Sequence, residues 1–89
     1  MQISYDDLER VDGPTLDLLH AQDRAVCSVL TKAGRQGWYR WRTAADRNGE
    51  LAFELVTDEN PPAFLARLTP RDLSLNSGDF ARTVWERLN

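Results

Sequence analysis

The chain has 89 residues, a formal net charge of -3 and a hydrophobic content of 42%. A chain of this length builds one modest core and has little volume left for a deep, enclosed active-site cavity. Its hydrophobic content is too high, and its net charge too low, for an intrinsically disordered protein. We therefore expect a single folded domain over residues 1–89 that works through its surface or through shallow clefts.

The composition also indicates where the protein works. No apolar run approaches the roughly 18 to 20 residues that span a bilayer, and the segment Met1 to Asp7 is acidic where a signal peptide is basic. We expect a cytoplasmic protein. Cys27 is the only cysteine, which excludes an intrachain disulfide and a zinc finger. All basic residues except Lys32 are arginines, a skew that favours a bacterial or phage source.

Two helices are predicted in the N-terminal part. Ser4 is followed by an acidic turn that includes Asp7, a pattern typical of a helix N-cap, so a short helix is expected near residues 4–10. Beyond Asp12-Gly13-Pro14, apolar residues at helical spacing predict one helix from Thr15 to Gly34. Gln22 is the only polar residue inside its apolar stripe.

Residues 37–45 and 50–57 have the composition of two β-strands that form a hairpin. A two-residue Asn-Gly turn would mix arginines into the apolar face. A three-residue loop over residues 47–49, with Asp46 opening a type I turn and Gly49 in the left-handed conformation, avoids this. The hydrophobic pattern therefore predicts that Trp41 pairs with Leu55 and that Arg42 pairs with Glu54.

This register gives the hairpin two unlike faces. The apolar face contains Tyr39, Trp41, Thr43, Leu51, Phe53 and Leu55. The opposite face contains Trp38, Arg40, Arg42, Ala52, Glu54 and Val56. We expect the apolar face to contact the core and the opposite face to contact solvent.

The C-terminal part is predicted to be helical. Asn60-Pro61-Pro62 is typical of a helix start, so a short helix is expected over residues 61–68. Phe64, Ala66 and Leu68 also alternate, so a third strand is the alternative there. Residues 69–72 predict a turn, and Asp79 to Leu88 predict an amphipathic helix. The predicted fold is α+β, with two N-terminal helices, a central antiparallel β-hairpin and two C-terminal helices.

Positive charge is concentrated in one short segment. Residues 1–31 carry two arginines and six acids, residues 32–47 carry five bases and one acid, and residues 48–89 carry four arginines and seven acids. The basic segment is also rich in tryptophan and tyrosine, and tryptophan, tyrosine and arginine anchor many protein interfaces. We predict a binding surface centred on Trp38, Arg40 and Arg42, with Arg35 and Arg47 at its rim.

A purely structural interpretation of the same residues is the alternative. In that case Arg42 pairs with Glu54, Arg40 lays its aliphatic stem over Val56, and Trp38 folds back to cover the core.

Catalytic chemistry has little support in the sequence. His20 and Cys27 lie seven residues apart, about 10 Å along a helix, which is too far for a Cys-His pair. Asp23 shares their helix face, but this loose spacing is not that of a structural metal site. Phosphate-binding, dinucleotide-binding and hydrolase motifs are absent from the sequence. We expect no catalytic activity, no cofactor and no metal.

The sequence thus predicts a small protein-protein interaction module, an adaptor, regulator or inhibitor whose partner has an acidic surface. The alternative is a nucleic-acid-binding regulatory protein that uses the same β-strand, since aromatic and arginine side chains also bind single-stranded nucleic acids. A two-stranded hairpin leaves unpaired backbone groups on both edges. We therefore expect a third strand from residues 63–68 or from the N-terminal stretch, or else another chain, such as a second copy in a homodimer.

Overall fold

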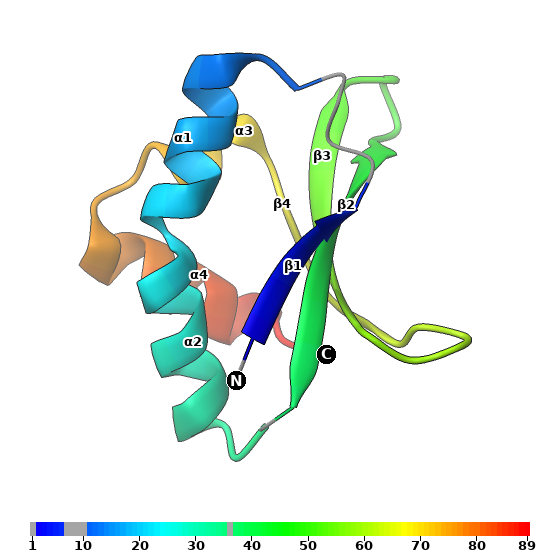
Figure 1. Ribbon diagram of the computed structural model, residues 1–89. Helices are drawn as coiled ribbons and strands as arrows, with labels where there is room; N and C mark the ends of the chain where they lie inside the picture. Colours follow the sequence, from blue (N-terminus) through cyan, green and yellow to red (C-terminus); the bar gives the residue numbers. More distant parts are fainter. Residues whose placement is uncertain (1, 7–10, 36) are drawn as a thin grey trace.

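The protein folds into a four-stranded mixed sheet covered on one side by helices (Figure 1). The computed structural model describes residues 2–6, 11–35 and 37–89. In chain order the elements are β1 (Gln2–Asp6), α1 (Gly13–Ala21), α2 (Asp23–Lys32), β2 (Trp38–Ala45), β3 (Leu51–Thr57), β4 (Phe64–Leu68), α3 (Pro70–Leu73) and α4 (Ser77–Arg87). The strand order is β1-β2-β3-β4, with β1 parallel to β2 and the other pairs antiparallel. The predicted α+β class is confirmed.

The β2–β3 hairpin has the predicted register. Trp41 pairs with Leu55, and Arg42 pairs with Glu54. The Asp46 carboxylate accepts hydrogen bonds from the backbone N–H groups of Asn48 and Glu50, and Gly49 has a φ of 75°. Because a side chain at φ near 75° would be strained, glycine is the residue that closes this loop.

The helix predicted near residues 4–10 is wrong over its first part, since Ser4 lies in the middle of β1. Residues 7–10 lie outside the described residues. Ile3 and Tyr5 direct partly buried side chains toward the helix layer, and Ser4 between them is exposed. This alternation is the signature of a strand that is covered on one face. The N-terminal stretch therefore fills one edge of the hairpin.

The helix predicted from Thr15 to Gly34 is two helices that meet at Gln22. The buried Gln22 amide donates hydrogen bonds to the backbone carbonyls of Leu73 and Leu75, at 3.2 and 2.9 Å. These bonds tie the break between α1 and α2 to the last residue of α3 and to the segment that follows it. The polar residue inside the apolar stripe thus serves as a buried crosslink between two parts of the helix layer.

Gln22→Ala is expected to lower the free energy of unfolding by about 1 to 3 kcal/mol, because it leaves buried carbonyls without a donor. Chemical denaturation followed by circular dichroism measures this loss. The matched control is Asn48→Ala, which removes an amide side chain exposed in the hairpin loop and for which we expect a change below about 0.5 kcal/mol. Equal losses in the two variants would contradict the crosslinking role of Gln22.

The helix predicted over residues 61–68 is wrong, and the alternative, a third strand, is confirmed as β4. Strand β4 pairs with β3 and contains an irregularity opposite Leu55 and Val56. Pro61 and Pro62 lie in the preceding loop instead of starting a helix. With β1 on one side and β4 on the other, both edges of the hairpin are paired within the chain. The prediction that a hairpin edge is available to a second copy is therefore corrected.

The C-terminal helices follow the sequence more closely. Thr69 and Asp72 form a reciprocal capping box at the start of the short helix α3, where a turn was predicted. The side chain of Asn76 caps α4 by accepting from the backbone N–H of Asp79 at 2.9 Å. The amphipathic helix predicted from Asp79 is confirmed, with two further residues at its start.

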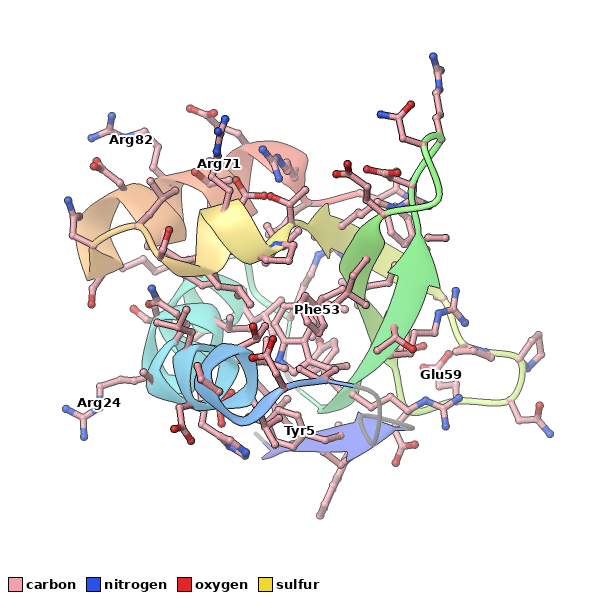
Figure 2. All side chains as sticks on the ribbon, turned by 90° about the horizontal axis from the view of Figure 1, so that it is seen from above. Tyr5, Arg24, Phe53, Glu59, Arg71 and Arg82 are labelled. Carbon is pink, nitrogen blue, oxygen red and sulfur yellow. The ribbon has the colours of Figure 1, made fainter. Side chains whose placement is uncertain are left out.

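One continuous core lies between the sheet and the helices. Phe53 points from β3 into this layer, as Figure 2 shows. Trp41 and Phe80 are fully buried in it, from β2 and α4. The other buried residues of this core are Val11, Leu19, Val26, Val29, Leu30, Tyr39, Leu55, Leu65, Leu68, Leu73 and Val84. All helices of the described chain lie on the side of the sheet that carries this core (Figure 1), so the opposite side is left without a helix.

Candidate functional site

The sheet surface that faces away from the helices is called the open face here. The pairing of the strands assigns to it Ser4, Trp38, Arg40, Arg42, Ala44, Ala52, Glu54, Val56, Phe64 and Arg67. The loop between β3 and β4 swings out on this side, as the yellow-green segment of Figure 1 and the position of Glu59 in Figure 2 show. Side chains and this loop, instead of helices, border the open face.

Ala52 and Val56 form the floor of the open face. Both residues are fully buried, yet neither belongs to the core between sheet and helices. The register places Val56 between Arg40 on β2 and Phe64 on β4. Long side chains on the flanking strands therefore bury the apolar floor, as expected where arginine stems lie over apolar surface.

Two aromatic side chains remain exposed beside this floor. Trp38 is 63% exposed and Phe64 is 40% exposed. Trp38 stands at the first position of β2, and its backbone carbonyl accepts a hydrogen bond from the N–H of Asp58 at 2.9 Å. The alternative in which Trp38 folds back onto the core is therefore wrong. Exposed large aromatic side chains of this kind mark surfaces that gain by contact with a partner.

A charged row crosses the open face next to the aromatic residues. The Glu54 carboxylate accepts from Arg42 Nε at 3.0 Å and from Arg67 Nη2 and Nε at 2.7 and 3.1 Å. The Glu54 side chain is nearly buried, whereas the two arginine side chains are 40% and 50% exposed. One carboxylate thus holds two guanidinium groups in place while both continue to face solvent.

The pKa of Glu54 reflects this arrangement. Burial alone raises the pKa of the carboxyl, but hydrogen bonds from Arg67 and Arg42, and their charges, outweigh burial, so the pKa lies below its usual value. The carboxylate therefore stays ionised at neutral pH. The Arg42–Glu54 ion pair, which the purely structural interpretation predicted, is present, and Arg67 is a second partner that the sequence did not indicate.

Of the five residues predicted as a binding surface, three lie together and two lie elsewhere. Trp38, Arg40 and Arg42 lie together on the open face, as predicted. Arg35 lies near the end of α2 and donates a hydrogen bond to the backbone carbonyl of Asn89. Arg47 is exposed in the hairpin loop, beyond the last paired residues of β2 and β3.

Phe64 and Arg67 were missed in the sequence because the segment that contains them was predicted as a helix. The alternation of Phe64, Ala66 and Leu68 was the available signal for a strand, and a strand here adds a fourth row of side chains to the sheet. With β4 in place, the open face carries arginines on both sides of Glu54.

A second polar cluster joins β1 to the helices. The Tyr5 hydroxyl donates to the Asp23 carboxylate at 2.5 Å, and the rings of Tyr5 and His20 lie 4.4 Å apart. Figure 2 shows Tyr5 beside β1, on the side of the N-terminal helices. Burial and the neighbouring Asp23 raise the pKa of the Tyr5 hydroxyl above its usual value, so it remains neutral. This contact positions β1 against α2.

Cys27, on the same helix, is not activated. Burial, followed by the charge of Asp23, raises the pKa of the Cys27 thiol, whereas a nucleophilic cysteine needs a lowered pKa. Across the described ranges, no group of three or more His, Cys, Asp or Glu side chains is arranged to hold a metal ion. His20, Asp23 and Cys27 thus do not form a metal centre in the structure.

A shallow groove lies between the N-terminal helices and the start of α4, and its lining includes His20, Asp23, Arg24, Ser28 and Ser77. It is on the helix side of the molecule, away from the open face.

None of the helices in the part of the chain that the structure describes is long and apolar enough to cross a membrane. Comparisons of the chain with protein families, with curated proteins and with solved structures give no significant match.

Proposed function

We propose that this protein is a non-enzymatic protein-protein interaction module, of the adaptor, regulator or inhibitor class, that binds its partner through the open face. The observation that carries this proposal is the exposure of Trp38 and Phe64 beside ordered arginines on a sheet face that no described helix covers. Tryptophan and arginine are the residue types that most often dominate binding energy at protein interfaces.

The charged row of Arg42, Glu54 and Arg67 preorganises the open face for binding. Because Glu54 holds Arg42 and Arg67 in the free protein, less side-chain entropy is lost when these arginines meet a partner. Arg42 uses only Nε in its bond to Glu54, so its two terminal nitrogens can donate to a partner's carboxylate. We infer that the partner places an acidic group over the arginine row and an apolar group on Trp38 and Phe64.

Nucleic-acid binding through the same face is the second candidate, supported by the combination of exposed aromatic rings and arginines. The buried Glu54 carboxylate disfavours it, because it offsets one of the positive charges that would neutralise phosphates. Salt dependence separates the two candidates. Raising the salt concentration from about 0.05 to 0.3 M should weaken nucleic-acid binding steeply and an aromatic-anchored protein contact mildly.

Trp38→Ala is expected to weaken partner binding about 30-fold or more, as for other central interface tryptophans. The test is quantitative affinity capture from the native host, with proteins and nucleic acids both identified, followed by titration of the captured partner. Trp85→Ala is the matched control, since Trp85 is 52% exposed on α4 and lies on the helix side. Binding that survives Trp38→Ala but not Trp85→Ala would reject the proposal.

A further inference from the structure

The two outer edges of the sheet differ in how their backbone groups are satisfied. On β4, Leu65 and Arg67 direct their backbone carbonyls away from β3. The Leu65 carbonyl accepts from the N–H of Asn89 at 2.8 Å, and the Arg67 carbonyl accepts from Arg87 Nη1 at 3.2 Å. The end of α4 and the residues after it therefore occupy these two carbonyls, so that they are not available to another strand.

Along the outer edge of β1, the described residues provide no such cover. The hydrogen bond from the Asp58 N–H to the Trp38 carbonyl shows that the even-numbered residues of β2 direct their backbone groups toward β3. Tyr39 and Trp41 therefore face β1, and in a parallel ladder each bonds the two residues that flank its partner. It follows that Ile3 and Tyr5 direct their N–H and C=O groups away from the sheet.

No group in the part of the chain that the structure describes bonds to these outward N–H and C=O groups. An edge with free donors and acceptors is a template for pairing with another strand. Within the described residues, the β4 edge thus has partners for its outward carbonyls, whereas the β1 edge is open.

We propose that the β1 edge pairs antiparallel with β1 of a second copy, about a two-fold axis that passes through Ser4. Antiparallel pairing needs outward residues opposite one another, and an axis at Ser4 places Ile3 opposite Tyr5 of the second copy twice, with about four backbone hydrogen bonds. An axis at Ile3 or at Tyr5 would leave only one such pair and a shorter overlap.

The sequence of β1 is self-complementary in this register. Ser4 meets Ser4 of the second copy on the open face, where the side chain is small and exposed. Ile3 meets Tyr5 on the helix side, and pairs of β-branched and aromatic residues are favourable neighbours across strands. Polar positions thus face polar ones and apolar positions face apolar ones, as an isologous dimer interface requires.

The dimer would contain one continuous eight-stranded sheet, with the helices of both copies on one side and both open faces on the other. This inference does not depend on the proposed function. If both hold, the dimer presents two binding surfaces side by side, and a partner with two matching segments would bind with increased avidity.

The test uses opposite charges at Ser4, whose exposed side chain allows the fold to tolerate either sign. In the Ser4→Glu and Ser4→Lys variants two like charges meet across the axis, which should raise the dimer dissociation constant about 10-fold or more. Mixing the two variants should restore a dimer that contains one of each. Multi-angle light scattering gives the mass, and native mass spectrometry identifies the mixed dimer. Ser28→Glu, an exposed position on α2, should leave the dimer unchanged.

Ile3→Pro provides a second test, because proline fits an edge position whose N–H points outward but cannot donate to a second strand. This variant should remain folded by circular dichroism and become monomeric. A wild-type chain that is monomeric up to about 1 mM would overturn the proposal, since a specific dimer should form below that concentration. A dimer that persists unchanged in Ser4→Glu, Ser4→Lys and Ile3→Pro would overturn it equally.

Discussion

Trp41→Ala is expected to lower the free energy of unfolding by about 3 to 5 kcal/mol, whereas Trp38→Ala should change it by less than about 1 kcal/mol. The two tryptophans lie on the same strand but on opposite faces. Trp41 is fully buried in the core, and its removal leaves a cavity among close-packed neighbours. Trp38 is 63% exposed on the open face, so its removal costs little packing.

Urea denaturation followed by far-ultraviolet circular dichroism measures both changes without relying on tryptophan fluorescence. The two variants should share the same denaturant slope, since both unfold from the same compact state. Comparable losses in the two variants would mean that Trp38 is structural, and the case for an interaction surface at the open face would fail with it.

The second large effect is expected when Glu54 loses both of its arginines. Arg42→Met with Arg67→Met should destabilise the protein by about 2 to 3 kcal/mol, less than for a fully buried pair because the arginines are partly exposed. Methionine is chosen because its apolar chain keeps the carboxylate covered. Each single variant leaves one guanidinium on Glu54, so the combined loss should exceed the sum of the single losses.

The same double variant should reverse the pH dependence that Glu54 contributes. In the wild type the folded-state pKa of Glu54 is lowered below its usual value of 4.5, so its stabilisation is present above that pH and is lost on acidification. Without the arginines burial prevails and raises the pKa, so the contribution of Glu54 is present at low pH and is lost as the pH rises. The double variant should therefore be more strongly destabilised at pH 7 than at pH 4.

Adding Glu54→Gln to the double variant removes the ionisable group, and should remove this difference between the two pH values. The matched control is Arg71→Met with Arg82→Met, two exposed arginines on the helix side (Figure 2), with an expected change below about 0.5 kcal/mol each. An equal destabilisation at pH 4 and pH 7 would show that Glu54 is not held by Arg42 and Arg67 in solution.

The hairpin was predictable from the sequence because the residues that determine its loop and register are close together in the chain. The loop needs an aspartate that accepts from the following backbone and a glycine at positive φ, and Asp46 and Gly49 occur at the required spacing. Only one register then keeps arginine away from Phe53. Helix α4 was predictable for a similar reason, since Asn76, Asp79 and a clear apolar stripe specify it without reference to the rest of the chain.

The elements that were predicted wrongly depend on contacts distant in the sequence. Ser4 has the character of a helix cap, but pairing with β2 and the contact of Tyr5 with Asp23 favour a strand. The break at Gln22 follows from its bonds to Leu73 and Leu75, which no local pattern shows. Residues 64–68 had both helical and alternating patterns, and pairing with β3 decides for the strand.

The candidate site was predictable to the same extent as the hairpin. Trp38, Arg40 and Arg42 are brought together by the register of β2, which the sequence specified. Phe64 and Arg67 join them only because β4 pairs with β3. Arg35 was grouped with them through its position in the basic segment, yet the turn after α2 directs it to Asn89. Outside β2, closeness in sequence did not indicate which residues lie together on the open face.

The central claim is that the open face is the surface that meets the partner, and site-specific photocrosslinking tests it most directly. A benzophenone amino acid is placed at Trp38, at Phe64 and, as the control, at Trp85 on the helix side. The same partner should become covalently linked from Trp38 and from Phe64, and it should not be linked from Trp85. A partner that is captured by the protein but linked only from Trp85 would contradict the account.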